Sequence, residues 1–214
     1  MGTAKKLVGL LGGTFNPVHN GHIAIAEHCL STYGLDEIQF MPNNIQPSSK
    51  HVGVDANIRA DMLSLALAGF PYFSINTVEL EQNKSSFTVD SLQLLRAQNP
   101  DIIWCFIIGF DTFNQLNTWN GWQDLFSLCH IIVVDRRGSK IHYSAWQKEA
   151  LSCYSLESNK SLRNYDHGKL ILDDVYCDDG VSSSAVRAQL LGSNDASGIP
   201  PSVLAYIKQH KLYL

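Results

Sequence analysis

Residues 7–23 read LVGLLGGTFNPVHNGHI, and this stretch decides the fold. The apolar run 7–11 predicts a strand that is buried on both faces and ends at the glycine pair Gly12 and Gly13. Helical spacing resumes at Ile23, so the chain passes from a strand through a glycine-rich turn into a helix. Such a turn brings free backbone N–H groups and the positive end of the helix to one place. The stretch therefore predicts a site for an anion, and phosphate is the natural occupant.

Two histidines, His19 and His22, stand where this helix is expected to begin. Their imidazole N–H groups would point at the same anion and so favour a phosphate site. From these residues alone two other interpretations stay open: a structural turn with two surface histidines, or a pair of metal ligands at helical spacing. The metal pair is the weaker of the two, because the neighbouring sequence does not complete the ligand set of a zinc site.

Length and composition describe an ordinary globular domain. The chain has 214 residues, of which 45% are hydrophobic and 17% charged, enough for one core. We therefore predict a single domain over 1–214, with 181–214 as its C-terminal helical part. The net charge of -4 argues against a nucleic-acid partner, and no apolar run is long enough to cross a membrane. Five cysteines without a C-x-x-C pair suit reduced thiols in a cytoplasmic protein.

Strand-like and helix-like segments alternate along the chain. The segments that read as strands are 7–11, 37–41, 73–75, 102–108, 130–135 and 169–172. Those that read as helices are 21–33, 55–69, one opened by 87–92, one opened by 181–187, and 202–210. This alternation predicts an α/β fold built on a parallel sheet.

The sequence assigns no functional role to two regions of the chain. Arg59 and Asp61 fall toward the polar side of the helix 55–69, where charged residues usually form a solvated face. The segment 141–167 is irregular, and the sequence does not place the helices within it.

Several residues follow the predicted strands directly, at the edge where parallel sheets bind ligands. The loop 43–50 leaves the second strand and is either a ligand loop or a plain connector. Gly109 and Asp111 follow the strand 102–108. The glycine lets a ligand approach the backbone, and the carboxylate could hold a ribose hydroxyl or a magnesium-bound water, or cap a helix. Trp119 offers a flat platform for a planar ring, although tryptophans also pack in cores.

The segment 12–22 resembles the signature of the HxGH nucleotidyltransferases and, within that superfamily, of the bacterial nicotinate mononucleotide adenylyltransferases. The segment 181–187, VSSSAVR, is similar to the second signature of this family, which grips the phosphates of ATP. The segment 86–92, SFTVDSL, is similar to the one whose helix start receives the pyridine carboxylate, and we expect Thr88 to be the N-cap. The stretch 116–119, LNTW, resembles the family's Leu-Pro-Thr-Trp.

This resemblance extends over almost the whole chain and implies a Rossmann-like, doubly wound parallel sheet. It implies transfer of AMP from ATP to nicotinate mononucleotide, giving deamido-NAD and pyrophosphate, with Mg²⁺ accompanying ATP and no metal site made by the protein alone. A homo-oligomer stays open. The catalytic residues implied are His19, His22 and Arg187. The residues expected to bind ATP are Gly12, Gly13, Thr14, Phe15, His19, His22, Gly109, Asp111, Ser182, Ser183 and Arg187. Those expected to bind the mononucleotide are Asn44, Lys50, Thr88 and Trp119.

Some positions depart from the family pattern. Asn16 stands where many members carry Asp, Asn117 replaces a proline, Asn120 replaces an aromatic residue or histidine, and 46–50 replaces a Pro-Pro-His-Lys type sequence. These departures concern the acceptor pocket, including its choice between acid and amide, more than the ATP site. Three alternatives remain: a pantetheine-phosphate adenylyltransferase, a cytidylyltransferase that uses CTP, and a noncatalytic sensor that binds ATP without turnover.

Overall fold

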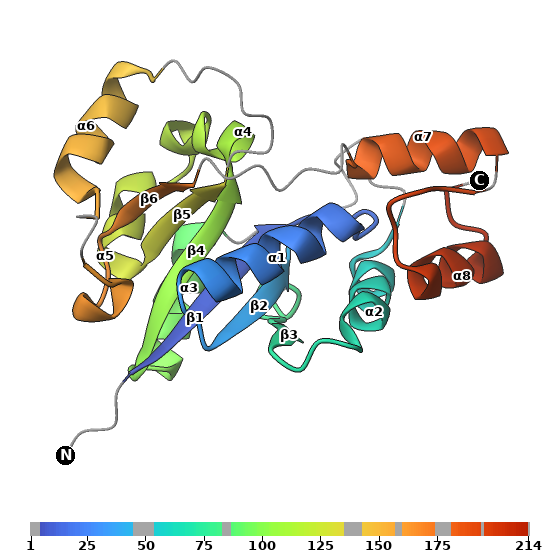
Figure 1. The fold of residues 1–214 in the computed structure, drawn as a ribbon, viewed down its shortest axis with the longest axis horizontal. Helices are drawn as coiled ribbons and strands as arrows, with labels where there is room; N and C mark the ends of the chain where they lie inside the picture. Colours follow the sequence, from blue (N-terminus) through green and yellow to red (C-terminus); the bar gives the residue numbers. More distant parts are fainter. Residues whose placement is uncertain are drawn as a thin grey trace.

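Parallel strands form the centre of the structure (Figure 1). The computed structural model describes residues 5–44, 54–82, 87–134, 143–156, 160–173, 181–193 and 195–213. Within these ranges the strands are β1 (Lys6–Gly13), β2 (Glu37–Pro42), β3 (Phe73–Ile75), β4 (Ile102–Gly109), β5 (His130–Val134) and β6 (Leu170–Asp173). Their order is β3-β2-β1-β4-β5-β6, and each neighbouring pair is parallel. The predicted α/β fold with a doubly wound parallel sheet is confirmed.

Both faces of the sheet are buried, because successive side chains of a strand point to opposite sides. In β1, Leu7 and Leu11 join one core, while Val8 and Leu10 join the other. The first core is covered by α1 (Asn20–Thr32), α2 (Ala56–Leu67), α7 (Ser183–Ser193) and α8 (Pro201–His210). The second is covered by α3 (Thr88–Gln98), α4 (Phe110–Phe113), α5 (Leu125–Leu128) and α6 (Ala145–Tyr154). Short 3-10 turns are η1 (Leu116–Thr118), η2 (Trp122–Asp124) and η3 (Leu162–Asn164).

The end of α1 follows the prediction. Gly34 lies just beyond the helix with φ +60°, a left-handed conformation that glycine adopts without strain. The N–H of Leu35 donates to the carbonyl of Leu30 at 3.1 Å, which closes the last turn. The chain then enters β2, which pairs with β1, so Gly34 fixes the point where α1 ends and the chain returns to the sheet.

Two expectations about helices were wrong. Asp55 caps α2, since its carboxylate accepts from the N–H of Asn57 at 2.8 Å. Arg59, however, is not on a solvated face: it is 1% exposed and shares the buried stripe of α2 with Met62 and Leu63. Thr88 is the first residue of α3 and not its cap; Phe87 occupies the cap position, and the Asp90 carboxylate accepts from the Phe87 N–H at 3.3 Å.

The region 141–167, whose helices the sequence did not place, contains α6. Ser144 precedes the helix, and its backbone N–H donates to the side-chain oxygen of Gln147 at 2.8 Å. A serine followed three residues later by glutamine is a helix-start pattern, and it is visible in the sequence. Trp146 then packs edge-on against Phe113 and Trp122, which holds α6 over the second core.

The two C-terminal helices lie together at one end of the molecule, next to α2 (Figure 1). Val203 and Ile207 of α8 are fully buried, as expected of a helix that packs back on the domain. The Ser202 hydroxyl of α8 also donates to the carbonyl of Leu65 in α2 at 3.1 Å. None of the helices in the described ranges is long and apolar enough to span a membrane.

Candidate active site

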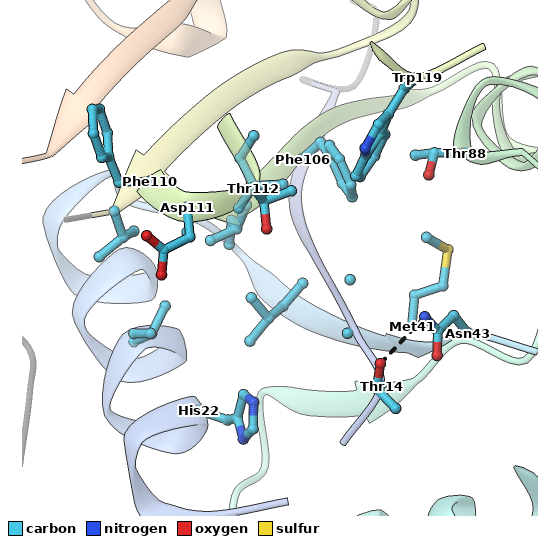
Figure 2. A pocket seen from close by; sticks show the side chains of 18 of the residues that line it. Thr14, His22, Met41, Asn43, Thr88, Phe106, Phe110, Asp111, Thr112 and Trp119 are labelled. Atoms are coloured by element: carbon cyan, nitrogen blue, oxygen red, sulfur yellow. Dashed lines mark hydrogen bonds between the residues drawn. The ribbon is translucent and has the colours of Figure 1, made fainter. Parts of the chain in front are cut away.

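A cavity of about 520 Å³ opens at the carboxyl ends of β1 and β4 (Figure 2). These strands are neighbours in the sheet, but the chain leaves β1 toward α1 on one face and β4 toward α4 on the other. Connections that diverge in this way leave a crevice, where α/β proteins bind ligands. The predicted site residues that line the cavity are Gly12, Gly13, Thr14, His22, Thr88, Gly109, Asp111 and Trp119.

His22 lines the cavity from the first turn of α1. Its Nδ1 accepts a hydrogen bond from the backbone N–H of His19 at 3.2 Å. A neutral imidazole with an accepting Nδ1 carries its proton on Nε2, so the Nε2–H is the donor that the ring can offer to a ligand. Because His22 lies in the first turn of α1, the positive end of the helix dipole is also at this end of the cavity, which is therefore suited to an anion.

Two aromatic neighbours fix the plane of the His22 ring. The His19 ring lies with its centroid 3.7 Å from that of His22, the planes inclined by 32°. The Phe15 ring meets His22 edge-on at 5.0 Å. Phe15 and His19 are each 1% exposed and do not line the cavity. Both were predicted to bind ATP, and the structure places them behind the ring that faces the cavity.

The signature glycines allow these rings to approach the backbone. A Cβ on Gly13 would lie 3.0 Å from the Phe15 ring, and one on Gly21 would lie 3.1 Å from the His19 ring. Contacts this short force the neighbouring group to move. Alanine at either position would therefore disturb the rings that orient His22.

The cavity has two chemically different ends. Figure 2 shows His22 and Asp111 on the side of α1, with Trp119 and Thr88 on the far side. Asp111 is an exposed carboxylate in the first turn of α4, directly after β4. Trp119 is half-buried, with its ring centroid 6.4 Å from that of Phe106. One end therefore offers N–H donors and a carboxylate, and the other offers aromatic rings.

Thr88 and Trp119 also border a second hollow of about 310 Å³ with Phe87 and Asn120. Since Thr88 opens α3, the first N–H groups of that helix have no partner within it and its positive end points the same way. The aromatic end of the cavity thus adjoins a place that favours a negative group.

Glu79 is a cavity residue that the sequence did not reveal. It lines the cavity, is 6% exposed, and accepts a hydrogen bond from the Ser91 hydroxyl at 3.3 Å. Burial raises the pKa of its carboxyl group from 4.5 to about 7, and the Ser91 bond offsets only part of this rise. It lies in a polar stretch with no periodic pattern, so nothing in the sequence separates it from a surface glutamate.

Arg59 was also missed. Its guanidinium donates to the carbonyl of Thr14 at 2.5 Å and to that of Asn43 at 2.7 Å. Thr14 and Asn43 both line the cavity. Burial lowers the pKa of Arg59, but arginine stays protonated in proteins, so this is a buried positive charge behind the cavity wall. The helical spacing of Arg59 with Met62, Leu63 and the other buried residues of α2 could have indicated that Arg59 is buried.

The second signature, 181–187, packs against the loop of the first signature, 12–22. Arg187 donates to the carbonyl of Asn16 at 2.6 Å and to the Ser184 hydroxyl at 3.1 Å. The Ser183 hydroxyl donates to the carbonyl of Pro17 at 2.9 Å, and the Ser182 hydroxyl accepts from the N–H of Ala185 at 3.1 Å. Ser182, Ser183 and Arg187 do not line the cavity. They lie against the loop that leads to His19.

Two predicted substrate-binding residues remain, Asn44 and Lys50. The side-chain amide of Asn44 donates to the carbonyl of Gln82 at 3.2 Å, and Asn44 does not line the cavity. Lys50 lies outside the described residues. Across the described ranges, no three His, Cys, Asp or Glu side chains are grouped to hold a metal ion.

Comparison with known proteins identifies relatives over the full chain. The sequence profile of a cytidylyltransferase-like family matches residues 10–189. A protein of Pseudoalteromonas atlantica named "Probable nicotinate-nucleotide adenylyltransferase" is 34% identical, with 100% of this chain and 97% of that protein aligned. One of the same name from Citrifermentans bemidjiense is 36% identical, with 97% and 98% aligned.

Solved structures share the fold. Nicotinic acid mononucleotide adenylyltransferase of Plasmodium falciparum, complexed with NaAD, superposes with a TM-score of 0.74 at 18% identity, covering 97% of each chain. The structure titled as a putative nicotinate-nucleotide adenylyltransferase of Vibrio parahaemolyticus superposes with a TM-score of 0.63 at 18% identity, covering 97% of this chain and 95% of that one.

Proposed function

Because the chain belongs to the cytidylyltransferase-like family and, within it, to the nicotinate-nucleotide adenylyltransferases, we propose that it transfers the AMP group of ATP to nicotinate mononucleotide. The products are deamido-NAD and pyrophosphate, a step of NAD biosynthesis. The observation that carries this assignment is the full-length similarity to proteins of that name at 34% and 36% identity. The two-ended cavity supports it, since one end suits phosphates and the other a planar ring.

The reaction needs no nucleophile from the protein. An oxygen of the mononucleotide 5′-phosphate attacks the α-phosphorus of ATP, and the bond from that phosphorus to the bridging oxygen breaks. Pyrophosphate leaves with the electron pair. The protein therefore acts by placing the two substrates in line and by stabilising the charge that develops on the phosphate oxygens.

His22 is the donor to those oxygens. Its Nε2–H binds a phosphate oxygen while the His19 N–H and the Phe15 ring keep the imidazole in place. Gly12 and Gly13 supply backbone N–H groups to the same phosphates, and the positive end of α1 adds its dipole. Arg187 and Ser183 hold the loop ahead of His19. The family resemblance alone assigns Arg187, Ser182 and Ser183 to the β- and γ-phosphates.

The pyridine ring of the mononucleotide stacks on Trp119. Its carboxylate accepts from the first N–H groups of α3 at Thr88, where the helix dipole also favours a negative charge. Asn44 is assigned to the mononucleotide by the family resemblance alone.

Magnesium enters this proposal together with ATP. Mg²⁺ prefers oxygen ligands and is commonly held by one or two carboxylates together with substrate phosphates and water. Asp111, an exposed carboxylate on the cavity wall, fits that mode, and we assign it this role or a bond to a ribose hydroxyl. When bound, the ion offsets the negative charge of the phosphates.

We place the reaction in the cytoplasm. Among the described residues, Cys105, Cys129 and Cys153 are free thiols, which supports a reducing compartment.

Pyrophosphate release tests the proposal. ATP with nicotinate mononucleotide should give rapid release. A parallel assay with nicotinamide mononucleotide measures how strongly the enzyme prefers the acid to the amide. Release with phosphopantetheine, or with CTP in place of ATP, would instead assign another nucleotidyltransferase activity. ATP binding without release under any condition would contradict catalysis and favour a nucleotide sensor.

A further inference from the structure

A single buried guanidinium joins the two loops that form one wall of the cavity. Arg59 lies on α2 with 1% of its surface exposed. One terminal nitrogen, Nη1, donates to the carbonyl of Thr14, in the loop between β1 and α1, at 2.5 Å. The other, Nη2, donates to the carbonyl of Asn43, in the loop after β2, at 2.7 Å. Hydrogen bonds from a charged donor are stronger than neutral ones, so both loops are held firmly.

The same two loops also contact each other directly. The N–H of Asn43 donates to the carbonyl of Gly13 at 3.0 Å, and its side-chain amide reaches the Thr14 hydroxyl at 3.4 Å (Figure 2). The second distance is long for a hydrogen bond and contributes little by itself. Arg59 therefore provides the strongest polar connection between Thr14 and Asn43.

Burying the charged guanidinium of Arg59 costs free energy, and its hydrogen bonds to the two loops must offset that cost. The neighbouring residues of the buried stripe, Met62 and Leu63, are apolar, and an apolar side chain would be buried there without desolvating a charge. The Nε of Arg59 is buried and has no hydrogen-bond partner among the described residues. What the side chain supplies is the rigid fork of its two terminal nitrogens, which a lysine cannot reproduce.

We propose that Arg59 is a positioning residue that sets the distance between the ATP-binding loop at Thr14 and the mononucleotide-binding loop at Asn43. This inference rests on the proposed function, since it needs two substrates that meet in one cavity. Transfer requires the attacking phosphate oxygen to be in line with the α-phosphorus of ATP. A misplacement of about 1 Å can cost roughly 10²-fold in rate, whereas each substrate can still bind to its own loop. Arg59 therefore acts on kcat more than on KM.

The test compares Arg59→Lys with Arg163→Lys. Arg163 is a matched control, because its guanidinium also bonds two backbone carbonyls, those of Gly34 at 2.8 Å and Lys5 at 3.3 Å, and it does not line the cavity. For each variant we would measure unfolding by circular dichroism and pyrophosphate release over a range of both substrates. We expect Arg59→Lys to fold and to lose about tenfold or more in kcat, with each KM within about threefold of the wild type. Arg163→Lys should keep the wild-type kcat.

A second variant distinguishes a positioning role of Arg59 in the reaction from a purely structural role of this residue. Arg59→Ala opens a space that free guanidinium can enter, and millimolar guanidinium should raise its kcat while leaving that of the wild type unchanged. A folded Arg59→Lys enzyme with kcat within twofold of the wild type overturns the inference. Loss of folding in both Arg59 variants also overturns it, because the fold itself would then require the residue. Failure of the wild-type enzyme to release pyrophosphate refutes the proposed function instead, so the two failures are distinguishable.

Discussion

Replacing His22 by alanine removes the imidazole N–H that the cavity offers to a phosphate oxygen. Because the Nδ1 of His22 accepts from the His19 N–H, the lost donor is the Nε2–H. Removing one positioned donor from a site of this kind lowers kcat by about 10²–10³-fold, or roughly 3–4 kcal/mol of transition-state stabilisation. We expect His22→Ala to fall in that range, with a smaller change in the KM for nicotinate mononucleotide, which binds at the other end of the cavity.

The effect of this change on the fold should be small. His22→Ala leaves the His19 N–H without its acceptor at the start of α1, which resembles the loss of a helix cap and costs about 1 kcal/mol. A domain has about 5–15 kcal/mol of net stability, so the variant should remain folded. The loss of turnover is then a property of the site.

The assay is pyrophosphate release from ATP and nicotinate mononucleotide, with urea unfolding measured on the same preparations. His210→Ala serves as the control, because His210 is exposed on α8 and stacks on Tyr206 at 4.2 Å, away from the cavity lining. A folded His22→Ala enzyme whose turnover matches that of His210→Ala would refute the role given to His22.

Three further predictions concern the aromatic end, the buried titratable groups and the C-terminal packing. Trp119→Ala should raise the KM for nicotinate mononucleotide by about 10–100-fold and leave the KM for ATP near its wild-type value, since base stacking on an aromatic side chain contributes about 1–3 kcal/mol; equal changes in both KM values would contradict a stacking role. Glu79 and His130 should oppose each other in the pH dependence of stability: burial raises the pKa of Glu79 to about 7, so its contribution is lost as pH rises from 4.5 to 7, and burial lowers the pKa of His130 to about 4, so its contribution is lost as pH falls from 6.5 to 4. In the wild type, the free energy of unfolding measured in urea should therefore change little between pH 5 and pH 6 on account of this pair. In Glu79→Gln the free energy of unfolding should rise with pH by up to about 1.4 kcal/mol per unit, and a flat profile in this variant would refute the opposing roles of Glu79 and His130. Gly198→Ala should lower the free energy of unfolding by about 2 kcal/mol or more, because φ is +75° and a Cβ would lie 2.4 Å from a methyl group of Val181; wild-type stability of this variant would contradict the argument.

The sheet could be predicted because its signals are local. The runs in β1 and β4 are apolar at every step, and only a strand buried on both faces requires that. The glycine-rich turn and the two histidines follow β1 directly, so their place at the edge of the sheet was fixed by the chain itself. The convergence of His22 and Asp111 on the same cavity also follows from the rule that parallel strands end together, since one follows β1 and the other follows β4.

Arg59 was missed because a charged residue on a helix was expected to lie on the solvated face. The buried positions of α2 include Arg59, Met62 and Leu63. The spacing of Arg59 to Met62 and Leu63 is helical, so a buried arginine was consistent with the pattern. What sequence could not supply were the two carbonyls that make its burial tolerable, because they belong to loops distant along the chain.

His19, Phe15 and Arg187 show a second limit. A motif indicates which residues gather near a ligand, but not which of them faces it. In the structure the rings of His19 and Phe15 stand behind His22, and Arg187 bonds the backbone of Asn16. Their separation into facing and supporting residues depends on ring packing, which the order of residues does not encode.

The bonds to Asn16 have a consequence for how the enzyme is made. Its backbone carbonyl is held by Arg187, 171 residues later, and its side-chain oxygen accepts from the hydroxyl of Tyr213, 197 residues later. A ribosome releases the first loop long before it has produced either of these partners. The nascent chain therefore carries that loop without these two bonds until residues 187 and 213 have been made, and the ability to consume ATP is expected to arise only after that point. A prematurely terminated product, even one carrying the whole N-terminal signature, is expected to be inert.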